Sequence, residues 1–154
     1  MEKHIYISIR ILKTAELNSG EADLRNAAID AASRAYAPYS GFQVGAAVLL
    51  ENRMMFEGNN QENVAYPSGM CAERVALFAA GASCPDTAVE AIAIAAFKNG
   101  EMQDSISPCG ACRQVLLETE NRYQKPVKIY LCGKDETVVV SSAKDLLPLS
   151  FGRM

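Results

Sequence analysis

Three cysteines and one glutamate constrain this chain more than any other feature of its sequence. Glu73 stands two residues after Cys71, and a second pair of thiols stands three residues apart at Cys109 and Cys112. Three thiolates leave one position of a tetrahedral zinc ion open, and an open position can hold a reactive water. The fold must therefore bring two distant segments to one point, and the pattern predicts a hydrolytic zinc site with a carboxylate to move protons.

Both cysteine segments are predicted to begin helices. Cys109 and Cys112 share one helix face at i and i+3, and Pro108 just before them is typical of a helix start. The unpaired N–H groups and the dipole of a helix N-terminus favour the thiolate, which is the form that binds metal. Residues i and i+2 do not share a face, so Cys71 and Glu73 reach one centre only if their helix begins close to Cys71.

Glu73 is interpreted as a proton carrier and not as a fourth ligand. The only histidine of the chain is His4, in a predicted edge strand, so histidine acid–base chemistry is not expected. Arg74 is expected to donate to thiolate sulfurs, because three thiolates around Zn²⁺ leave an excess of negative charge. A closed structural zinc site stays open as an alternative, with Cys84 or Cys132 as the fourth ligand, and so does a redox-active pair of cysteines.

The composition limits the kind of partner. The 154 residues have the length of one domain, and 49% hydrophobic and 21% charged residues are typical of a soluble globular protein. A net charge of -3 with scattered Lys and Arg argues against a nucleic acid polymer as partner. No apolar run is long enough for a membrane span, and the alternating N-terminus differs from a signal peptide. We expect a cytoplasmic protein whose five cysteines are free, catalytic or metal-bound.

Hydrophobic periodicity predicts an α/β fold. Alternating isoleucines over residues 5–11 indicate a strand at the N-terminus. Asn18-Ser19 is a plausible cap for the first helix, Pro38 follows that helix, and Gly81 is expected to end the second. The predicted helices cover 24–35, 71–80, 109–119 and 143–147, and the remaining predicted strands cover 43–50, 54–57, 88–97, 127–132 and 137–140. This order predicts three α-β-α layers around a central mixed five-stranded sheet, with an extra N-terminal strand.

Taken together, the motifs resemble the cytidine deaminase family, in its small, three-cysteine, homotetrameric branch. CAER at 71–74 and PCGACRQ at 108–114 are similar to the zinc motifs of that family. YSGFQVGAA at 39–47 is similar to its segment under the pyrimidine, and NQEN at 60–63 with AYP at 65–67 to its ribose-reading segment. The likeness runs from about Leu24 to Gly152, whereas residues 1–18 match no motif, and Val75 stands where the family often has threonine.

The resemblance implies that Glu73 would protonate the ring and the departing amine. Besides Glu73 and Arg74, there would be three sets of site residues. The first set would hold one Zn²⁺ per subunit: Cys71, Cys109 and Cys112. The second would pack on the base and hydrogen-bond the ribose 3′-hydroxyl: Phe42, Asn60 and Glu62. The third would complete the site of a neighbouring subunit in a homotetramer: Ala65, Tyr66 and Phe151. From the residues alone, the aromatic rings of these sets are equally well explained as core or interface residues, and the polar pair is better explained as part of a loop turn.

The implied activity is zinc-dependent hydrolytic deamination of cytidine and deoxycytidine. The products would be uridine, deoxyuridine and ammonia, as in pyrimidine salvage, and residues 19–154 would form a single deaminase domain behind an N-terminal extension over 1–18. A blasticidin-S-type or other small-molecule aminopyrimidine deaminase is the alternative enzyme. A structural zinc module used for interaction is the alternative that is not an enzyme, and it needs four filled zinc positions and no role for Glu73.

Overall fold

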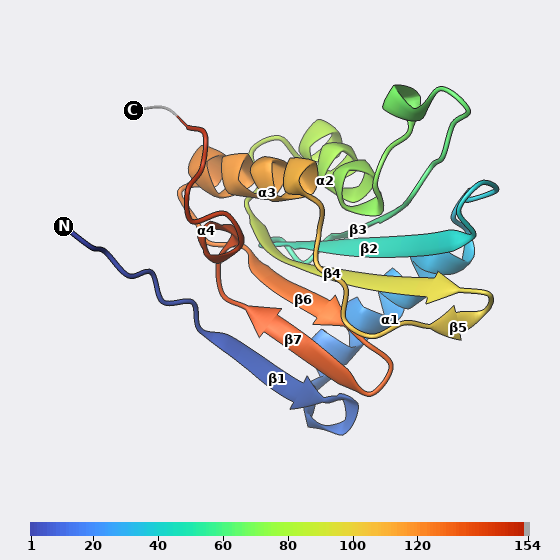
Figure 1. The fold of residues 1–154 in the computed structure, drawn as a ribbon, viewed down its shortest axis with the longest axis horizontal. Coiled ribbons are helices and arrows are strands. Elements are labelled where there is room, and N and C mark those ends of the chain that lie inside the picture. Colours follow the sequence, from blue (N-terminus) through green and yellow to red (C-terminus); the bar gives the residue numbers. More distant parts are fainter. Residues whose placement is uncertain (153–154) are drawn as a thin grey trace.

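The protein has three layers, with a mixed sheet between two layers of helices (Figure 1). The computed structural model describes residues 1–152. The strands are β1 (Ile9–Lys13), β2 (Phe42–Leu50), β3 (Met55–Asn59), β4 (Val89–Lys98), β5 (Glu101–Met102), β6 (Lys128–Cys132) and β7 (Glu136–Val140). The sheet runs in the order β1-β7-β6-β4-β2-β3, and β5 pairs with β4. The predicted α-β-α fold is confirmed, with the predicted extra strand β1 at one edge and the short β5 as an unpredicted addition.

The helices divide between the two faces of the sheet. They are α1 (Ser19–Ser33), α2 (Ala72–Ser83), α3 (Gly110–Tyr123) and α4 (Ala143–Leu146), with short 3₁₀ turns at Thr14–Glu16 and Tyr66–Ser68. Figure 1 shows α1 on one face and the other three helices on the opposite face. None of the helices within residues 1–152 is long and apolar enough to cross a membrane. Each face of the sheet buries its own apolar cluster, and the larger cluster lies beneath α2, α3 and α4.

Strand β4 joins the two halves of the sheet. It pairs antiparallel with β2 on one side and parallel with β6 on the other, in register from Ala91↔Lys128 to Ala95↔Cys132. Its residues are almost all buried, as expected for an apolar central strand covered on both faces. Strand β4 therefore contributes Ile92 and Ile94 to the apolar cluster on which α2 and α3 pack.

Several element ends differ from the sequence prediction. Strand β1 begins at Ile9, so residues 5–8 are exposed and lie outside the sheet. Helix α1 ends at Ser33, before the predicted end. Helix α2 continues through Gly81 to Ser83, because one glycine costs only about 1 kcal/mol in a helix that is otherwise held by apolar contacts. Helix α3 runs on to Tyr123 and ends at Gln124, which adopts φ +52°.

Two glycines allow helices to lie directly on the strands. A Cβ on Gly45 of β2 would stand 2.0 Å from the carbonyl oxygen of Ala28 in α1. A Cβ on Gly58 of β3 would stand 2.4 Å from the amide nitrogen of Ala76 and 2.6 Å from the carbonyl oxygen of Ala72, both in α2. Contacts this short with backbone atoms cannot be relieved by a side-chain rotation. Gly58 therefore sets how closely α2, and with it the segment of Cys71, approaches the sheet.

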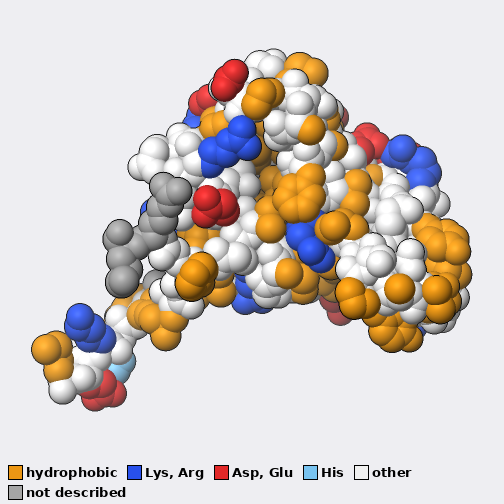
Figure 2. Space-filling view, turned by 90° about the horizontal axis from the view of Figure 1, so that it is seen from above, with side chains coloured by type: hydrophobic (Ala, Val, Ile, Leu, Met, Phe, Trp, Pro, Cys, Tyr) orange, Lys and Arg blue, Asp and Glu red, His pale blue; other side chains and the backbone are white. Residues whose placement is uncertain are grey.

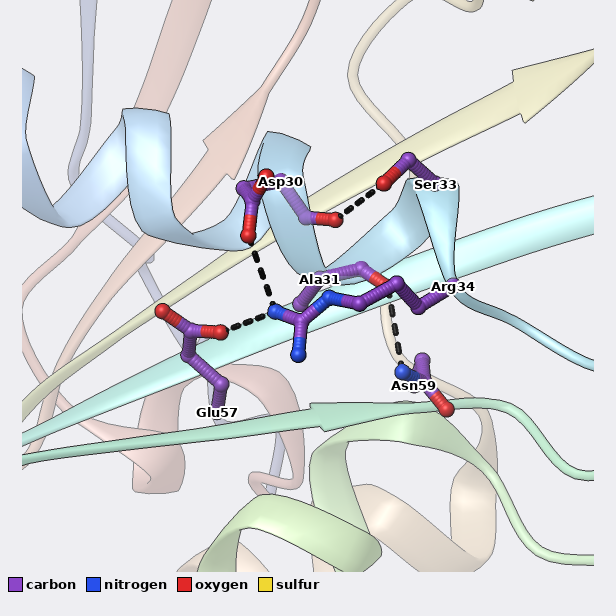
Figure 3. A network of polar contacts seen from close by, with 6 residues as sticks. All are labelled: Asp30, Ala31, Ser33, Arg34, Glu57 and Asn59. Carbon is purple, nitrogen blue, oxygen red and sulfur yellow. Dashed lines mark hydrogen bonds and ion pairs between the residues drawn. The ribbon is translucent and has the colours of Figure 1, made fainter.

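Polar contacts fix the junction between the end of α1 and strand β3. Arg34, just after α1, forms ion pairs with Asp30 one turn earlier and with Glu57 of β3 (Figure 3). The side-chain amide of Asn59, the last residue of β3, donates to the carbonyl oxygen of Ala31 at 3.1 Å. These contacts anchor the point at which the chain leaves β3 and enters the 60–70 loop.

Substituting Gly58 with alanine is expected to destabilise the protein. The added methyl group has to push α2 away from β3, and overpacking of this kind typically costs about 1–3 kcal/mol. Urea unfolding should show a lower midpoint with an unchanged slope. Gly20→Ala is the matched control, because a Cβ there meets only the Asn18 side chain at 3.6 Å. An unchanged midpoint for Gly58→Ala would mean that α2 does not depend on this close approach.

Candidate metal centre

Three cysteine sulfurs converge at the ends of two helices. The Sγ atoms of Cys71, Cys109 and Cys112 all lie within 4.8 Å of one another, and those of Cys71 and Cys109 are 3.8 Å apart. Cys71 is the N-cap of α2 with φ -73° and ψ 151°, and Cys109 is the N-cap of α3. The backbone at Cys71 is thus extended and the helix begins at Ala72, which confirms the helix start required by the spacing of Cys71 and Glu73.

Glu73 lies in the first turn of α2 and is 4% exposed. Burial raises the pKa of its carboxyl above the usual value, and the charge of the neighbouring Cys71 thiolate raises it as well. A raised pKa brings a carboxyl group closer to the range in which it can serve as both acid and base at neutral pH. Glu73 is not part of the three-sulfur cluster, so its position fits a proton carrier better than a ligand.

The charge balance of the cluster favours a bound cation. The hydrogen bond from Cys112 and the nearby Arg74 lower the pKa of the Cys71 thiol to about 5, whereas the contact with Cys71 and burial raise the pKa of Cys112. One thiol of the pair therefore ionises at the expense of the other, because adjacent like charges oppose each other. A divalent cation removes this conflict and allows three thiolates together. The sulfur donor set fits zinc, which thiolates bind tetrahedrally.

Arg74 also contacts the cluster, as predicted. Its Nη2 donates to Cys71 Sγ at 3.5 Å. Its Nε is buried and has no hydrogen-bond partner among residues 1–152. A guanidinium beside metal-binding sulfurs offsets part of their negative charge and orients them.

The two remaining cysteines lie outside the cluster. Cys84 is the C-cap of α2, at the opposite end of that helix from Cys71, and its sulfur contacts Met54 Sδ at 3.8 Å. Cys132 is buried in β6, where its thiol donates to the carbonyl oxygen of Tyr130 at 3.6 Å. Neither can reach the centre without moving a helix or a central strand, so the arrangement of described residues favours three protein ligands and an open fourth position.

A cavity of about 510 Å³ opens beside Cys71. Four of the residues predicted from sequence line it, namely Cys71, Asn60, Glu62 and Tyr66. Four other lining residues lie within the quoted motifs but were given no role of their own, namely Tyr39, Ser40, Gln61 and Asn63, and the last two, Gly69 and Met70, lie outside those motifs. Most of the residues that line the cavity belong to the 60–70 loop. The two ends of this loop are held by the β3 junction and by the start of α2. Its size suits a small ligand and not a folded macromolecule.

Asn60 holds the start of β2 through its side chain. Its Oδ1 accepts from the amide of Val44 at 2.8 Å, and its Nδ2 donates to the carbonyl of Phe42 at 2.9 Å. An amide side chain has one further lone pair and one further N–H to offer a ligand. Phe42 is partly buried at the beginning of β2, on the same strand face as Val44, and does not line the cavity.

Glu62 is held by the turn before β2. Its carboxylate accepts from the amides of Tyr39 at 2.8 Å and Ser40 at 3.2 Å, and also from the Ser40 hydroxyl. The hydroxyl contact is the main reason why the pKa of Glu62 is lowered, and the two amides add to it. In the sequence, the pair Ser40-Gly41 indicates this turn, since Gly41 adopts φ +65°, a backbone conformation that favours glycine.

The C-terminal segment is attached to the start of α3. Arg113 donates to the carbonyl oxygens of Pro108 and Leu146, each at 2.9 Å, and Gln114 donates to the carbonyl of Phe151 at 3.0 Å. The Phe151 side chain itself is 88% exposed and does not line the cavity. Arg113 and Gln114 belong to the second zinc motif, but sequence reasoning gave them no role.

Known proteins are similar to this chain in both sequence and fold. Residues 19–125 match the family model of the "Cytidine and deoxycytidylate deaminase zinc-binding region". A cytidine deaminase from Halalkalibacterium halodurans is 40% identical over 124 residues, which are 80% of this chain and 88% of the relative. A cytidine deaminase from Mycobacterium tuberculosis is 37% identical over 132 residues, covering 84% of this chain and 87% of the relative.

Solved structures agree with the sequence comparison. The crystal structure of cytidine deaminase from Burkholderia pseudomallei superposes with a TM-score of 0.72 at 38% identity, over 88% of this chain and 100% of that chain. The structure from Mycobacterium tuberculosis gives a TM-score of 0.68 at 35% identity, over 85% of this chain and 96% of that chain. With its three clustered cysteines inside the matched zinc-binding region, the chain belongs to the cytidine and deoxycytidylate deaminase family.

Proposed function

We propose that this chain is a cytidine deaminase, a hydrolase that converts cytidine and deoxycytidine into uridine and deoxyuridine with release of ammonia. The observation that carries the proposal is the convergence of three sulfurs within 4.8 Å, with the buried Glu73 next to one of them. The overall reaction consumes one water and replaces the exocyclic amine at C4 by a carbonyl oxygen. The names of the relatives support the substrate class.

The three cysteines hold the metal in this proposal. When bound, Zn²⁺ activates water near neutral pH by lowering its pKa from 15.7 to about 7. Cys71 and Cys109 approach from helix N-caps, where the dipole stabilises thiolates. Arg74 offsets part of the remaining negative charge through its contact with Cys71 Sγ.

Glu73 moves the protons. It takes one proton from the attacking water and delivers it to N3 of the pyrimidine. It then takes the second proton from the hydroxyl formed at C4 and delivers it to the amine, which leaves as ammonia. The raised pKa of its carboxyl supports this role, because burial and the neighbouring Cys71 thiolate both favour its protonated form. Its burial also keeps bulk water away from the proton path.

Three further residues bind the nucleoside in this proposal. Phe42 packs on the flat base, and Asn60 and Glu62 hydrogen-bond the ribose 3′-hydroxyl. The positions of Asn60 and Glu62 in the wall of the cavity support their part. Because Glu62 keeps its charge and is held by backbone amides, it can accept from a hydroxyl without first being reoriented.

The active unit is proposed to be a cytoplasmic homotetramer that acts in pyrimidine salvage, with residues 19–154 as its deaminase domain. Ala65, Tyr66 and Phe151 would complete the site of a neighbouring subunit. Exposure supports this, since the side chains of Tyr66 and Phe151 are 81% and 88% exposed and large apolar groups at a surface often mark an interface.

Glu73→Gln is expected to keep the fold and the zinc but to lose turnover. Glutamine fills the same volume and cannot carry a proton, so kcat should fall by about 10²–10⁴-fold. Ammonia release from cytidine, deoxycytidine, cytosine and blasticidin S should be measured together with zinc per subunit. Glu118→Gln, at an exposed position of α3, is the control.

Two results of this experiment would count against the proposal. Near-normal turnover of cytidine by Glu73→Gln would remove Glu73 from the proton path. Activity of the unmodified protein on blasticidin S but not on the nucleosides would replace the proposed substrate by the alternative one.

Glu62→Gln is expected to weaken recognition of the ribose 3′-hydroxyl. Losing a hydrogen bond to a charged group costs about 1.5–3 kcal/mol, so kcat/KM for cytidine should fall by roughly 10–150-fold. The decisive comparison is with 3′-deoxycytidine, on which the substitution should have little effect because the partner hydroxyl is missing. An equal loss on both substrates would show that Glu62 acts only by holding the 39–40 turn.

A further inference from the structure

The N-terminal segment presents an apolar stripe that nothing within residues 1–152 covers. Residues 1–8 are exposed and leave the sheet before β1, so that they stand out from the body of the protein (Figures 1 and 2). Four isoleucines follow one another at every second position and are 46–57% exposed, namely Ile5, Ile7, Ile9 and Ile11. This stripe lies outside the matched family region, which begins at residue 19.

The stripe continues one face of the sheet. In the β1–β7 ladder, Ile9 is opposite Val140 and Ile11 is opposite Val138. Opposed residues of an antiparallel pair point to the same face, and both valines belong to the apolar cluster under α2, α3 and α4. The other face of β1 is already used, because Leu12 packs on the cluster under α1. The isoleucine face is therefore a core-like surface that lacks a cover.

The edge beside this stripe is free for strand pairing. Strand β1 is the last strand of the sheet order, with β7 as its only strand partner within residues 1–152. Residues 5–8 extend beyond the β7 ladder, which starts at Ile9. An edge strand with unpaired N–H and C=O groups can accept a further strand, and natural proteins usually block such an edge. Here residues 5–8 extend the edge instead, and together with residues 9–11 of β1 they form an apolar arm.

The isoleucines of this arm are placed symmetrically about Ser8. Reading outward from Ser8, Ile7 corresponds to Ile9 and Ile5 to Ile11, while Tyr6 corresponds to Arg10. Two antiparallel copies centred on this residue would place isoleucine opposite isoleucine on one face, and a tyrosine ring opposite a guanidinium on the other. Cross-strand apolar pairs and cation–π contacts both stabilise such a ladder.

Other antiparallel registers lose this complementarity. A centre at Ile7 places Lys3 opposite Ile11, and a centre at Ile9 places Lys13 opposite Ile5. Centring on Ser8 instead brings Lys3 opposite Lys13 at the ends, where like charges limit the ladder to the residues between them. Self-complementarity of one surface patch is the requirement for a two-fold contact between identical chains.

We propose that residues 5–11 form an antiparallel, two-fold strand pair with the same residues of a second copy of this chain. The contact joins the β1 edges of two sheets into one continuous sheet, and each isoleucine packs against its counterpart. A ladder of seven residues buries less than the roughly 1,200–2,000 Å² of interfaces that are stable alone. The contact therefore adds to other contacts between subunits, and it needs a test that traps it.

A cysteine at the symmetry point provides this test. Opposed Cα atoms in an antiparallel pair are about 4.5–5.5 Å apart, within the range that a disulfide spans. Ser8→Cys should therefore cross-link under mild oxidation and double the apparent mass on a non-reducing gel. Tyr6→Cys is the matched control, since Tyr6 is also exposed but would lie about 14 Å from its counterpart, too far for a disulfide.

The outcomes separate the proposal from chance contact. It predicts cross-linking of Ser8→Cys well above that of Tyr6→Cys and of the unmodified protein, whose own five cysteines set the background. Adding Ile7→Lys to Ser8→Cys should abolish the excess while leaving β1 intact, because residue 7 lies outside that strand. Equal cross-linking of both cysteine variants, no excess for Ser8→Cys, or an excess that survives Ile7→Lys would overturn it. None of these readouts depends on turnover, so they are independent of the deaminase assignment.

Discussion

The arrangement of three thiolates at two helix N-termini is the constraint on which the rest of this structure depends. Adjacent thiols cannot all ionise unless a cation lies between them, and the opposite pKa shifts of Cys71 and Cys112 express this conflict. Helix dipoles, Arg74 and a divalent metal resolve it together. The close approach of α2 to β3 at Gly58 fixes one of the two helices, so the packing of the core and the chemistry of the centre are linked.

Local sequence patterns predicted the centre well, because its requirements are themselves local. The spacing of Cys71 and Glu73 demanded a helix that begins between them, and α2 begins at Ala72. Alternating apolar residues indicated the N-terminal strand and a continuous apolar run indicated β4, while the Asn18 cap is present with its reciprocal partner Glu21. Both patterns survive in the sequence, because burial on one face of a sheet leaves a period of two and burial on both faces leaves an apolar run.

Features that depend on distant contacts could not be predicted in the same way. The end of α2 was placed at Gly81, whereas the helix continues to Ser83, because a single glycine costs a helix only about 1 kcal/mol. Two further contacts join residues that are far apart in sequence. The amide of Tyr39 donates to Glu62, and Arg113 donates to the carbonyl oxygen of Leu146 in the C-terminal segment. Phe42 and Phe151 do not line the cavity, so their roles still rest on the resemblance.

The most direct test of an open zinc centre is X-ray absorption at the zinc edge on the resting, zinc-loaded protein. With Cys71, Cys109 and Cys112 as the protein ligands, the spectrum should fit three sulfurs at about 2.3 Å and one oxygen at about 2.0 Å. Four sulfurs at about 2.3 Å would contradict the account, because a closed site has no position for water and gives Glu73 nothing to deprotonate.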